Sequence, residues 1–253
     1  MGSYYTPGRN SRCFSPTATE PFALSRSKID LFLKCARCFY LDRRLGIGQP
    51  PGFPFTLNNA VDTLLKKEFD AHRAKGEPHP MMVASGIDAI PFQHAKLEEW
   101  RDARRAGIRC LHEASNLVLH GGIDDVWVNP QGELILVDYK ATSKTSPVTL
   151  DADWQISYKR QIEMYQWLFR RNGFIVSNTG VFVYCNGDTS KEGLFGRLEF
   201  DIKILTYEGN DSWIERALLD ARECLMKNTW PKMAEDCDYC RYRKAIKVIT
   251  PST

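Results

Sequence analysis

The sequence predicts an α/β protein with a mixed central sheet flanked by helices, and a small Cys-rich metal subdomain made from both chain ends. Apolar residues recur with a helical period over about 28–44, 58–74 and 154–172, whereas Val-, Ile- and Leu-rich runs fill 109–128 and 133–141. Further apolar runs at 178–185 and 194–205 precede a helical segment at 209–227. This order of helices and strands is typical of a mixed sheet covered by helices.

Length and composition bound the possibilities. The 253 residues suffice for one core with a small appended subdomain. The net charge is only +3, so a nucleic-acid surface has to come from local clustering of basic residues. No apolar run approaches the roughly 18 residues that span a membrane, and the first residues do not read as a signal peptide. We therefore expect a cytoplasmic protein with no membrane partner.

The chain is expected to form one main domain. Residues 1–22, rich in Gly, Pro, Ser and Thr, predict a flexible tail, and residues 23–253 predict a single domain. Within it, residues 27–45 and 228–247 should form the metal-stapled subdomain. A polar helix is expected at 94–106, and a Cys-containing loop near the C-terminus.

A hairpin carries the most informative residues. Asn129-Pro130-Gln131-Gly132 fits a type I turn followed by a left-handed Gly132, so that Asn129 pairs with Glu133. Counting back along both strands places Asp124 opposite Asp138. Lys140 lies two residues beyond Asp138 and points to the same face. Two carboxylates and an amine therefore converge on one surface.

This grouping favours a divalent cation. Two close carboxylates repel each other unless a cation neutralises them, and Mg²⁺ or Mn²⁺ prefers such hard oxygen ligands. Lys140 would then orient or deprotonate a water molecule, or stabilise negative charge at phosphorus. The alternative is a surface hairpin with an incidental Asp and Lys. The apolar run that ends in Val137-Asp138-Tyr139-Lys140 argues against it, because a solvated strand alternates more clearly.

These residues resemble a known family. Gly121-Gly122-Ile123-Asp124 and Asp138-Tyr139-Lys140-Ala141-Thr142 are similar to the two motifs of PD-(D/E)xK nucleases of the RecB-like branch. The resemblance implies a restriction-endonuclease-like fold spanning residues 23–253. It also implies metal ligation by Asp124, Asp138 and the Tyr139 carbonyl, with a catalytic role for Lys140.

The resemblance extends to the next helix and has one departure. Gln161 and Tyr165 match the Gln-x-x-x-Tyr motif of this branch, which implies that they support the site or contact a DNA strand. Many members place a metal-binding His on the early helix, where this chain has Asp62. Asp62 could ligate the cation itself, or it could mark a weakened site. Glu68 is a further candidate carboxylate, although a solvated helix position explains it equally well.

Two Cys-x-x-Cys pairs predict a second metal centre. Cys35 and Cys38 lie in the first predicted helix, and Cys237 and Cys240 near the C-terminus, so four thiolates could share Zn²⁺ or an iron–sulfur cluster. The alternative is two separate reduced pairs. The chain resembles the iron–sulfur members of the branch, including the CRISPR-adaptation exonucleases, which implies a [4Fe–4S] cluster with Zn²⁺ as the alternative. Their third C-terminal Cys would fall at residue 246, which is Ile246 here, so Cys38 would supply the fourth ligand.

Basic and aromatic residues gather around these motifs. Lys144, Lys159 and Arg160 are expected to bind DNA, and the interleaved aromatic rings suit single-stranded DNA or free ends. The predicted function is a metal-dependent DNA nuclease, an exonuclease by resemblance, acting in repair, recombination or CRISPR adaptation with partner proteins of such a complex. The alternatives are a catalytically weakened DNA-binding or scaffold subunit with the same fold, and a restriction-type endonuclease.

Overall fold

The computed structural model describes residues 13–50, 52, 56–103, 105 and 107–249, with only the backbone of 247–249. The chain forms two compact units. The first contains Met1–Phe53, Leu111–Leu119 and Ser212–Thr253, and the second contains Pro54–Cys110 and His120–Asp211. Each unit is therefore built from segments that are far apart in the sequence.

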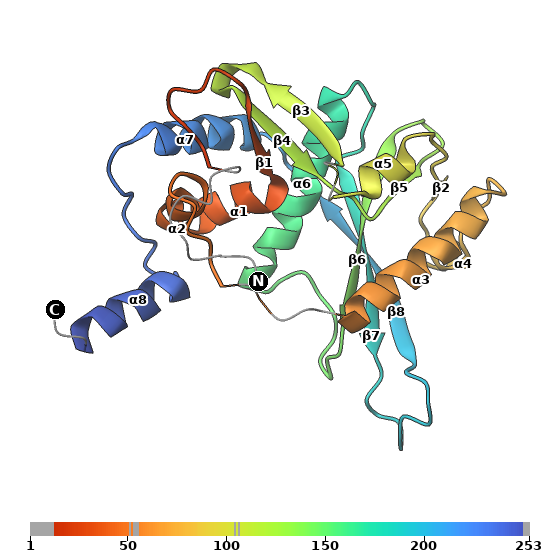
Figure 1. Ribbon diagram of the computed structural model, residues 1–253. Helices are drawn as coiled ribbons and strands as arrows, with labels where there is room; N and C mark the ends of the chain where they lie inside the picture. Colours follow the sequence, from red (N-terminus) through yellow and green to blue (C-terminus); the bar gives the residue numbers. More distant parts are fainter. Residues whose placement is uncertain (1–12, 51, 53–55, 104, 106, 250–253) are drawn as a thin grey trace. The chain divides into compact units, whose positions relative to one another are not determined.

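The first unit is mostly helical (Figure 1). Its elements are β1 (Phe22–Ser25), α1 (Arg26–Lys34), α2 (Ala36–Arg43), the 3-10 helix η2 (Glu113–Ser115), α7 (Ile214–Met226) and α8 (Asp238–Ile249). Strands β3 (Ile108–His112) and β4 (Leu117–Gly121) pass from one unit to the other, and with β1 they form a sheet of order β1-β4-β3.

The second unit holds the main sheet. Its helices are α3 (Thr56–Arg73), α4 (Pro80–Ala84), α5 (Leu97–Arg101), the 3-10 helix η3 (Asp153–Gln155) and α6 (Ile156–Arg171). The strands are β2 (Ile90–Pro91), β5 (Asp125–Val128), β6 (Leu134–Thr142), β7 (Thr179–Gly187) and β8 (Phe200–Glu208), in the order β2-β5-β6-β7-β8. Strands β6 and β7, joined through α6, pair in parallel, whereas β2 with β5, β5 with β6 and β7 with β8 pair antiparallel, so the sheet is mixed.

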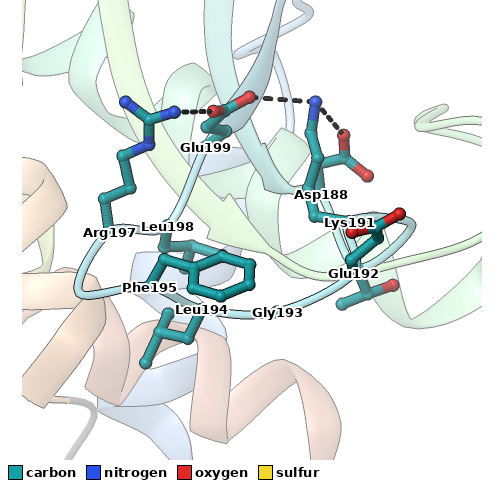
Figure 2. A pocket seen from close by; sticks show the side chains of 10 residues that line it. Asp188, Lys191, Glu192, Gly193, Leu194, Phe195, Arg197, Leu198 and Glu199 are labelled. Carbon is teal, nitrogen blue, oxygen red and sulfur yellow. Dashed lines mark ion pairs between the residues drawn. The ribbon is translucent and has the colours of Figure 1, made fainter.

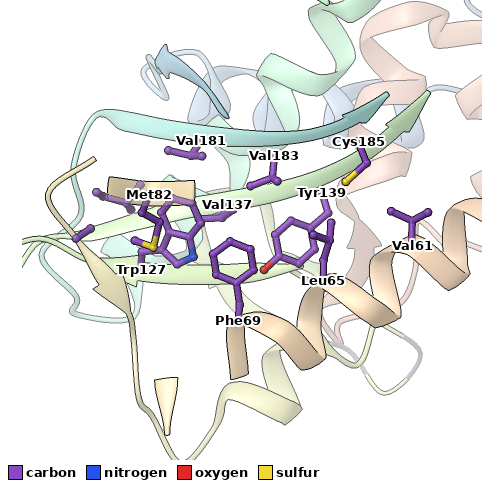
Figure 3. Close-up of a cluster of buried hydrophobic side chains, with 12 residues drawn as sticks. Val61, Leu65, Phe69, Met82, Trp127, Val137, Tyr139, Val181, Val183 and Cys185 are labelled. Atoms are coloured by element: carbon purple, nitrogen blue, oxygen red, sulfur yellow. The ribbon is translucent and has the colours of Figure 1, made fainter. Parts of the chain in front are cut away.

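One face of this sheet packs against α3. Val61, Leu65 and Phe69 recur at helical spacing and form the buried stripe of the helix. They meet side chains that alternate along the strands, including Val137 and Tyr139 of β6 (Figure 3). Phe69 stacks on Trp127 with ring centroids 5.3 Å apart. The period-2 alternation thus leaves Asp138 and Lys140 on the other face of β6.

Helix α6 approaches the opposite face closely. A Cβ at Gly180 of β7 would lie 2.3 Å from Ile162 Cγ2, so a glycine is required for this packing. Beyond the sheet, β7 and β8 continue into a hairpin whose tip exposes Leu194 and Phe195 (Figure 2). The Arg197 amide donates to the Leu194 carbonyl at 2.9 Å, and Phe195 adopts a positive φ of 45° in this turn.

The predicted fold class is confirmed: the sheet is mixed and flanked by helices, and a cluster of four cysteines joins both chain ends. Several predicted boundaries are wrong. The helix expected over 28–44 is two helices interrupted at Cys35, whose φ of −161° and ψ of 100° are extended. The strand expected from 194 begins at Phe200, because 194–197 form the hairpin turn, and the predicted C-terminal Cys-containing loop includes helix α8.

Smaller differences concern the edges of the fold. The helix expected over 94–106 is shortened to α5, with residues 104 and 106 outside the described residues, and the helix expected over 209–227 begins at Ile214. Most of the segment predicted as a flexible tail, residues 1–12, also lies outside them. Phe14 is buried, and its amide donates to the Arg43 carbonyl at 2.6 Å.

Candidate active site and four-cysteine centre

The β5–β6 hairpin has the predicted turn and register. Gly132 has a φ of 80°, and the Asn129 amide donates to the Glu133 carbonyl at 3.1 Å. Asp125 pairs with Val137, so the register brings Asp124 opposite Asp138. The turn chemistry of four residues therefore determines which carboxylates face each other.

Asp138 and Lys140 form the buried end of the site. Asp138 has no exposed surface; its Oδ1 accepts a hydrogen bond of 2.6 Å from Gln161 Nε2, and its Oδ2 forms an ion pair with Lys140. The Lys140 ammonium also lies 4.4 Å from the centre of the Tyr158 ring, a cation–π contact. Lysine, tyrosine and carboxylate thus fix one another on the α6 side of the sheet.

Asp124 is more open. Its side chain is 24% exposed, and its Oδ2 accepts a hydrogen bond of 2.9 Å from the Tyr139 amide. Burial raises the pKa of Asp124 to about 6, and the negative charge of Asp138 adds to the rise although Lys66 and Lys140 oppose it. The negative charge of Asp138 is therefore close enough to disfavour the ionised form of Asp124.

Gln161 and Tyr165 lie one turn apart on α6 and both reach the site. The Gln161 side-chain amide holds Asp138, and the Tyr165 hydroxyl donates to the carbonyl of Gly122, two residues before Asp124. Tyr165 is 2% exposed and Gln161 8%. Both side chains are therefore engaged by the protein itself.

A buried cluster of charged residues around Asp125 lies next to the site and was not predicted from the sequence. Asp125 has no exposed surface and accepts hydrogen bonds from the Tyr139 hydroxyl at 2.8 Å and from Arg101 at 3.0 Å, and it pairs with Arg73. Arg101 Nε also donates to the Asp124 carbonyl at 3.1 Å. Strand alternation places Asp125 on the face opposite Asp124, a signal that could have identified it as a support for the hairpin.

Tyr139 links the two faces of the hairpin. Its backbone amide donates a hydrogen bond to Asp124, and its hydroxyl donates one to Asp125. Burial, followed by the nearby charge of Asp125, raises the pKa of Tyr139 well above its usual value, so this hydroxyl stays a hydrogen-bond donor. The central residue of Asp138-Tyr139-Lys140 therefore holds both acidic residues of the facing strand.

Asp62 lies on α3 and is engaged by a lysine. Lys66, one turn further along the helix, places its Nζ 2.9 Å from Asp62 Oδ2 and 3.7 Å from Asp124 Oδ1. Among the described residues, the four cysteines are the one group of three or more His, Cys, Asp or Glu whose ligand atoms all lie within 4.8 Å of one another. Asp62 is therefore not gathered with Asp124 and Asp138 into a three-carboxylate cluster. Glu68 is bound instead to His79, 2.9 Å away.

The predicted DNA-binding residues make intramolecular contacts. Lys144 lies over the Trp154 ring at 5.4 Å and Lys159 over the Tyr207 ring at 5.6 Å. In the described part of the chain, no hydrogen bond or ion pair joins either lysine to the site carboxylates. Arg160 is half-buried on α6, next to Gln161.

The two Cys-x-x-Cys pairs come together within the first unit. Cys35 Sγ lies 3.8 Å from Cys240 Sγ, and Cys38 Sγ lies 3.6 Å from the sulfur atoms of both Cys237 and Cys240. The extended backbone at Cys35, rather than the expected shared helix face, turns the first pair toward the second. The predicted shared centre is confirmed as a site that could hold a metal ion or an iron–sulfur cluster.

The surroundings of the thiols shift their pKa values in different directions. Burial alone would raise the pKa of Cys35, but backbone amide hydrogen bonds from Ala234 and Cys38 lower it to about 7. Burial raises the pKa of Cys240 to about 11, and that of Cys38 further still. Four close thiolates need a cation to neutralise them, and soft sulfur ligands select Zn²⁺ or iron–sulfur clusters.

Comparison with known proteins identifies the family. The sequence profile of the PD-(D/E)XK nuclease superfamily matches residues 23–245. No curated protein sequence matches the chain significantly. A solved structure, the crystal structure of SSO0001, is 14% identical, with 92% of this chain and 88% of that chain covered and a TM-score of 0.37. No helix of the described residues is long and apolar enough to cross a membrane. The profile covers nearly the whole chain and includes every residue of both sites, and the chain belongs to the PD-(D/E)XK nuclease superfamily.

Proposed function

We propose that this chain is a divalent-metal-dependent deoxyribonuclease that hydrolyses phosphodiester bonds of DNA. The observation that carries the proposal is the pairing of Asp124 with Asp138 across a hairpin, with Lys140 on the same face and Gln161 holding Asp138. The superfamily consists of metal-dependent phosphodiesterases, which supports this class of reaction.

The residues fit a hard divalent cation. Asp138 Oδ2 is buried and engaged only by its ion pair with Lys140 among the described contacts, and Asp124 Oδ1 is the oxygen that the Tyr139 amide leaves unused. Together with the Tyr139 carbonyl, these carboxylates would hold Mg²⁺ or Mn²⁺. Such a cation lowers the pKa of a bound water molecule and neutralises charge at phosphorus.

The protein side chains would then have distinct roles. Lys140, held by Asp138 and Tyr158, would orient the attacking water or stabilise the developing negative charge. Gln161 and Tyr165 would position Asp138 and the strand that leads to Asp124. Lys144, Lys159 and Arg160 are proposed to bind the DNA backbone.

The finer assignment rests on the resemblance of motifs. The Gly-x-Ile-Asp, Asp-Tyr-Lys and Gln-x-x-x-Tyr residues support membership of the RecB-like branch, whose members include exonucleases. We propose an exonuclease that acts on single-stranded DNA or on free ends, in repair, recombination or CRISPR adaptation together with partner proteins.

For the cysteine centre, resemblance and geometry favour different metals. The resemblance favours [4Fe–4S], in which each thiolate binds a different iron atom and the cluster atoms separate the sulfurs. A tetrahedral Zn²⁺ with bonds of about 2.3 Å places its sulfurs about 3.8 Å apart. Three sulfur–sulfur separations of 3.6–3.8 Å are near this value, and all four sulfurs lie within 4.8 Å of one another, which favours a single ion, Zn²⁺, with a structural role.

The decisive test is cleavage of end-labelled single- and double-stranded DNA with Mg²⁺, Mn²⁺ or EDTA. We expect metal-dependent cleavage that is abolished by Asp138→Ala and reduced at least about 100-fold by Lys140→Ala. Lys203→Ala, which removes a more exposed lysine of the same sheet, is the matched control and should cleave like the wild type. Absence of cleavage with every metal, by protein whose cysteine centre is filled, would refute the proposal.

A second candidate function is a DNA-binding or scaffold subunit that lacks cleavage. The observation that favours it is the engagement of Asp62 by Lys66, in the place where related nucleases have a metal-binding histidine. This candidate predicts DNA binding without products in the same assay, with binding reduced by Lys144→Ala and Lys159→Ala.

A further inference from the structure

Lys66 places its ammonium between two carboxylates of the candidate metal site. Its side chain is 23% exposed, and its ammonium bridges two carboxylates, Asp62 on its own helix at 2.9 Å and Asp124 at 3.7 Å. The opposite oxygen of Asp124 is held by the Tyr139 amide, so the oxygen that faces Lys66 is the one available to a metal.

The charges around the site support the same conclusion. Three carboxylates, those of Asp62, Asp124 and Asp138, lie here, and within the described part of the chain the ammonium groups paired with them belong to Lys66 and Lys140. Lys140 neutralises Asp138, which leaves Lys66 as the partner of Asp124 in the described structure. Two facing carboxylates repel each other in the absence of a cation, so these lysines stabilise the hairpin before metal binds.

We propose that Lys66 is the resident cation of this site, which the divalent metal displaces from Asp124. The displaced ammonium keeps its ion pair with Asp62, one helical turn away, without any movement of the backbone. Asp62 is then a positioning residue that receives Lys66, and not a ligand of the metal. This inference rests on the proposed function, because it assumes that Asp124 and Asp138 hold the metal.

The chain offers a matched control. Lys67 is the next residue of α3 and lines the same surface cavity of about 770 Å³ as Asp62 and Lys66. Its side chain is exposed, and within the described structure no ion pair joins it to the site carboxylates. A general effect of lowering the local positive charge would appear in Lys67→Met, whereas displacement of a bound ammonium would appear only in Lys66→Met.

The test is a titration of the full chain with Mn²⁺ in the absence of DNA. The electron paramagnetic resonance signal of unbound Mn²⁺ measures how much of the ion is bound. We expect Lys66→Met to bind Mn²⁺ about tenfold more tightly than the wild type, because the competing charge is gone. Lys67→Met should differ from the wild type by less than about twofold. Asp124→Asn should abolish the binding, which assigns it to this site rather than to the cysteines.

A double variant separates the two roles of Asp62. If Asp62 only receives Lys66, Asp62→Asn should weaken Mn²⁺ binding in the wild type but have no effect once Lys66→Met is present. Weaker binding by the double variant than by Lys66→Met would make Asp62 a ligand and overturn this part of the inference.

Two further outcomes complete the test. Equal or weaker binding by Lys66→Met than by the wild type would overturn the displacement of Lys66, and so would absence of Mn²⁺ binding by both. DNA cleavage by the wild type in the same buffer shows whether the proposed nuclease function survives either outcome.

Discussion

At the residue scale, the buried carboxylate of Asp42 shows how this protein compensates desolvation. Asp42 is 2% exposed and lies between Lys28, whose Nζ is 2.5 Å away, and the guanidinium of Arg43 at 3.0 Å. Burial alone would raise the pKa of Asp42, but these two cations lower it below its usual value. The ionised form is therefore favoured by folding.

The stability of the fold should accordingly depend on Asp42 in acid. Because the folded pKa lies below the unfolded one, the contribution is complete above the unfolded value of about 3.9 and is lost as the pH falls through the folded pKa. Asp42→Asn should lower the free energy of unfolding at pH 7 by about 3 kcal/mol and flatten its dependence on pH below about 5.

Chemical denaturation across this pH range measures the effect. Asp220→Asn, which removes a partner of the more exposed pair with Arg216, is the control and should change stability little. An unchanged acid dependence in Asp42→Asn would show that other carboxylates control acid unfolding.

The positions of single residues could be predicted where they depend only on neighbouring residues in the sequence. Asp124, Asp138 and Lys140 follow from one turn and the period of a strand, and their positions in the hairpin are as predicted. Lys66 and Asp125 were missed, because their importance depends on a helix and a hairpin that meet only in the folded chain. The catalytic roles of Asp124, Asp138 and Lys140 are still predictions, and so is the role of Asp62.

At the element scale, the connection between β4 and β5, which carries Asp124, depends on a close approach at Gly122. A Cβ at Gly122 would lie 2.6–2.9 Å from Cβ, N and Cα of Ala103, and two of these are backbone atoms that cannot rotate away. The Gly122 carbonyl also accepts the hydrogen bond from Tyr165. A glycine is therefore needed where this segment passes Ala103, two residues after the end of α5.

Gly122→Ala should displace Asp124 and reduce cleavage strongly. We expect a loss of stability of about 1–3 kcal/mol from overpacking, together with at least about a 100-fold loss of cleavage, since small misplacement of a catalytic group is costly. Gly132→Ala is the control in the same hairpin, because its positive φ costs about 1 kcal/mol but no atom lies within 4 Å of the added Cβ. Equal cleavage by both variants would contradict the explanation.

The elements themselves were predictable in kind but not at their ends. The predicted stripe Val61, Leu64, Leu65 and Phe69 identified α3 because it recurs at helical spacing, but Leu64 is exposed and only the other three are buried. The break at Cys35 was not predictable, because Cys35 lies within an uninterrupted helical pattern and its extended backbone serves the contact with Cys240. Phe195 gave no turn signal either, since a bulky residue is rarely found at positive φ.

At the scale of the whole molecule, the four-cysteine centre closes a loop of about 200 residues between Cys38 and Cys237. We expect protein purified without oxygen to contain one Zn²⁺ per chain and no visible iron–sulfur absorption, measured by elemental analysis and absorbance. Four irons per chain with such absorption would contradict the assignment of a single Zn²⁺.

Chelation of the metal, or Cys240→Ser, should lower the melting temperature. At a free Zn²⁺ concentration 1,000 times Kd, binding of the ion adds about 4 kcal/mol to the free energy of unfolding.

The pairing of distant segments was predictable only in part. Two Cys-x-x-Cys pairs predicted that the chain ends meet, and the structure confirms this. Nothing in the sequence pattern indicated that residues 111–119 join those ends in the first unit, since they read as part of one continuous strand region. Long-range assembly of this kind depends on packing between elements, which periodicity does not reveal.

The sequence separation of the cysteines also has a consequence during synthesis. Cys38 and Cys237 are 199 residues apart. At about 5–20 residues per second, the first two thiols wait roughly 10–40 s for their partners to be translated. During that interval Cys35 and Cys38 can hold a metal only as a two-thiol site, or they remain open to oxidation. Newly made chains should therefore depend on a reducing environment and acquire the complete metal centre only after Cys237 and Cys240 have been translated.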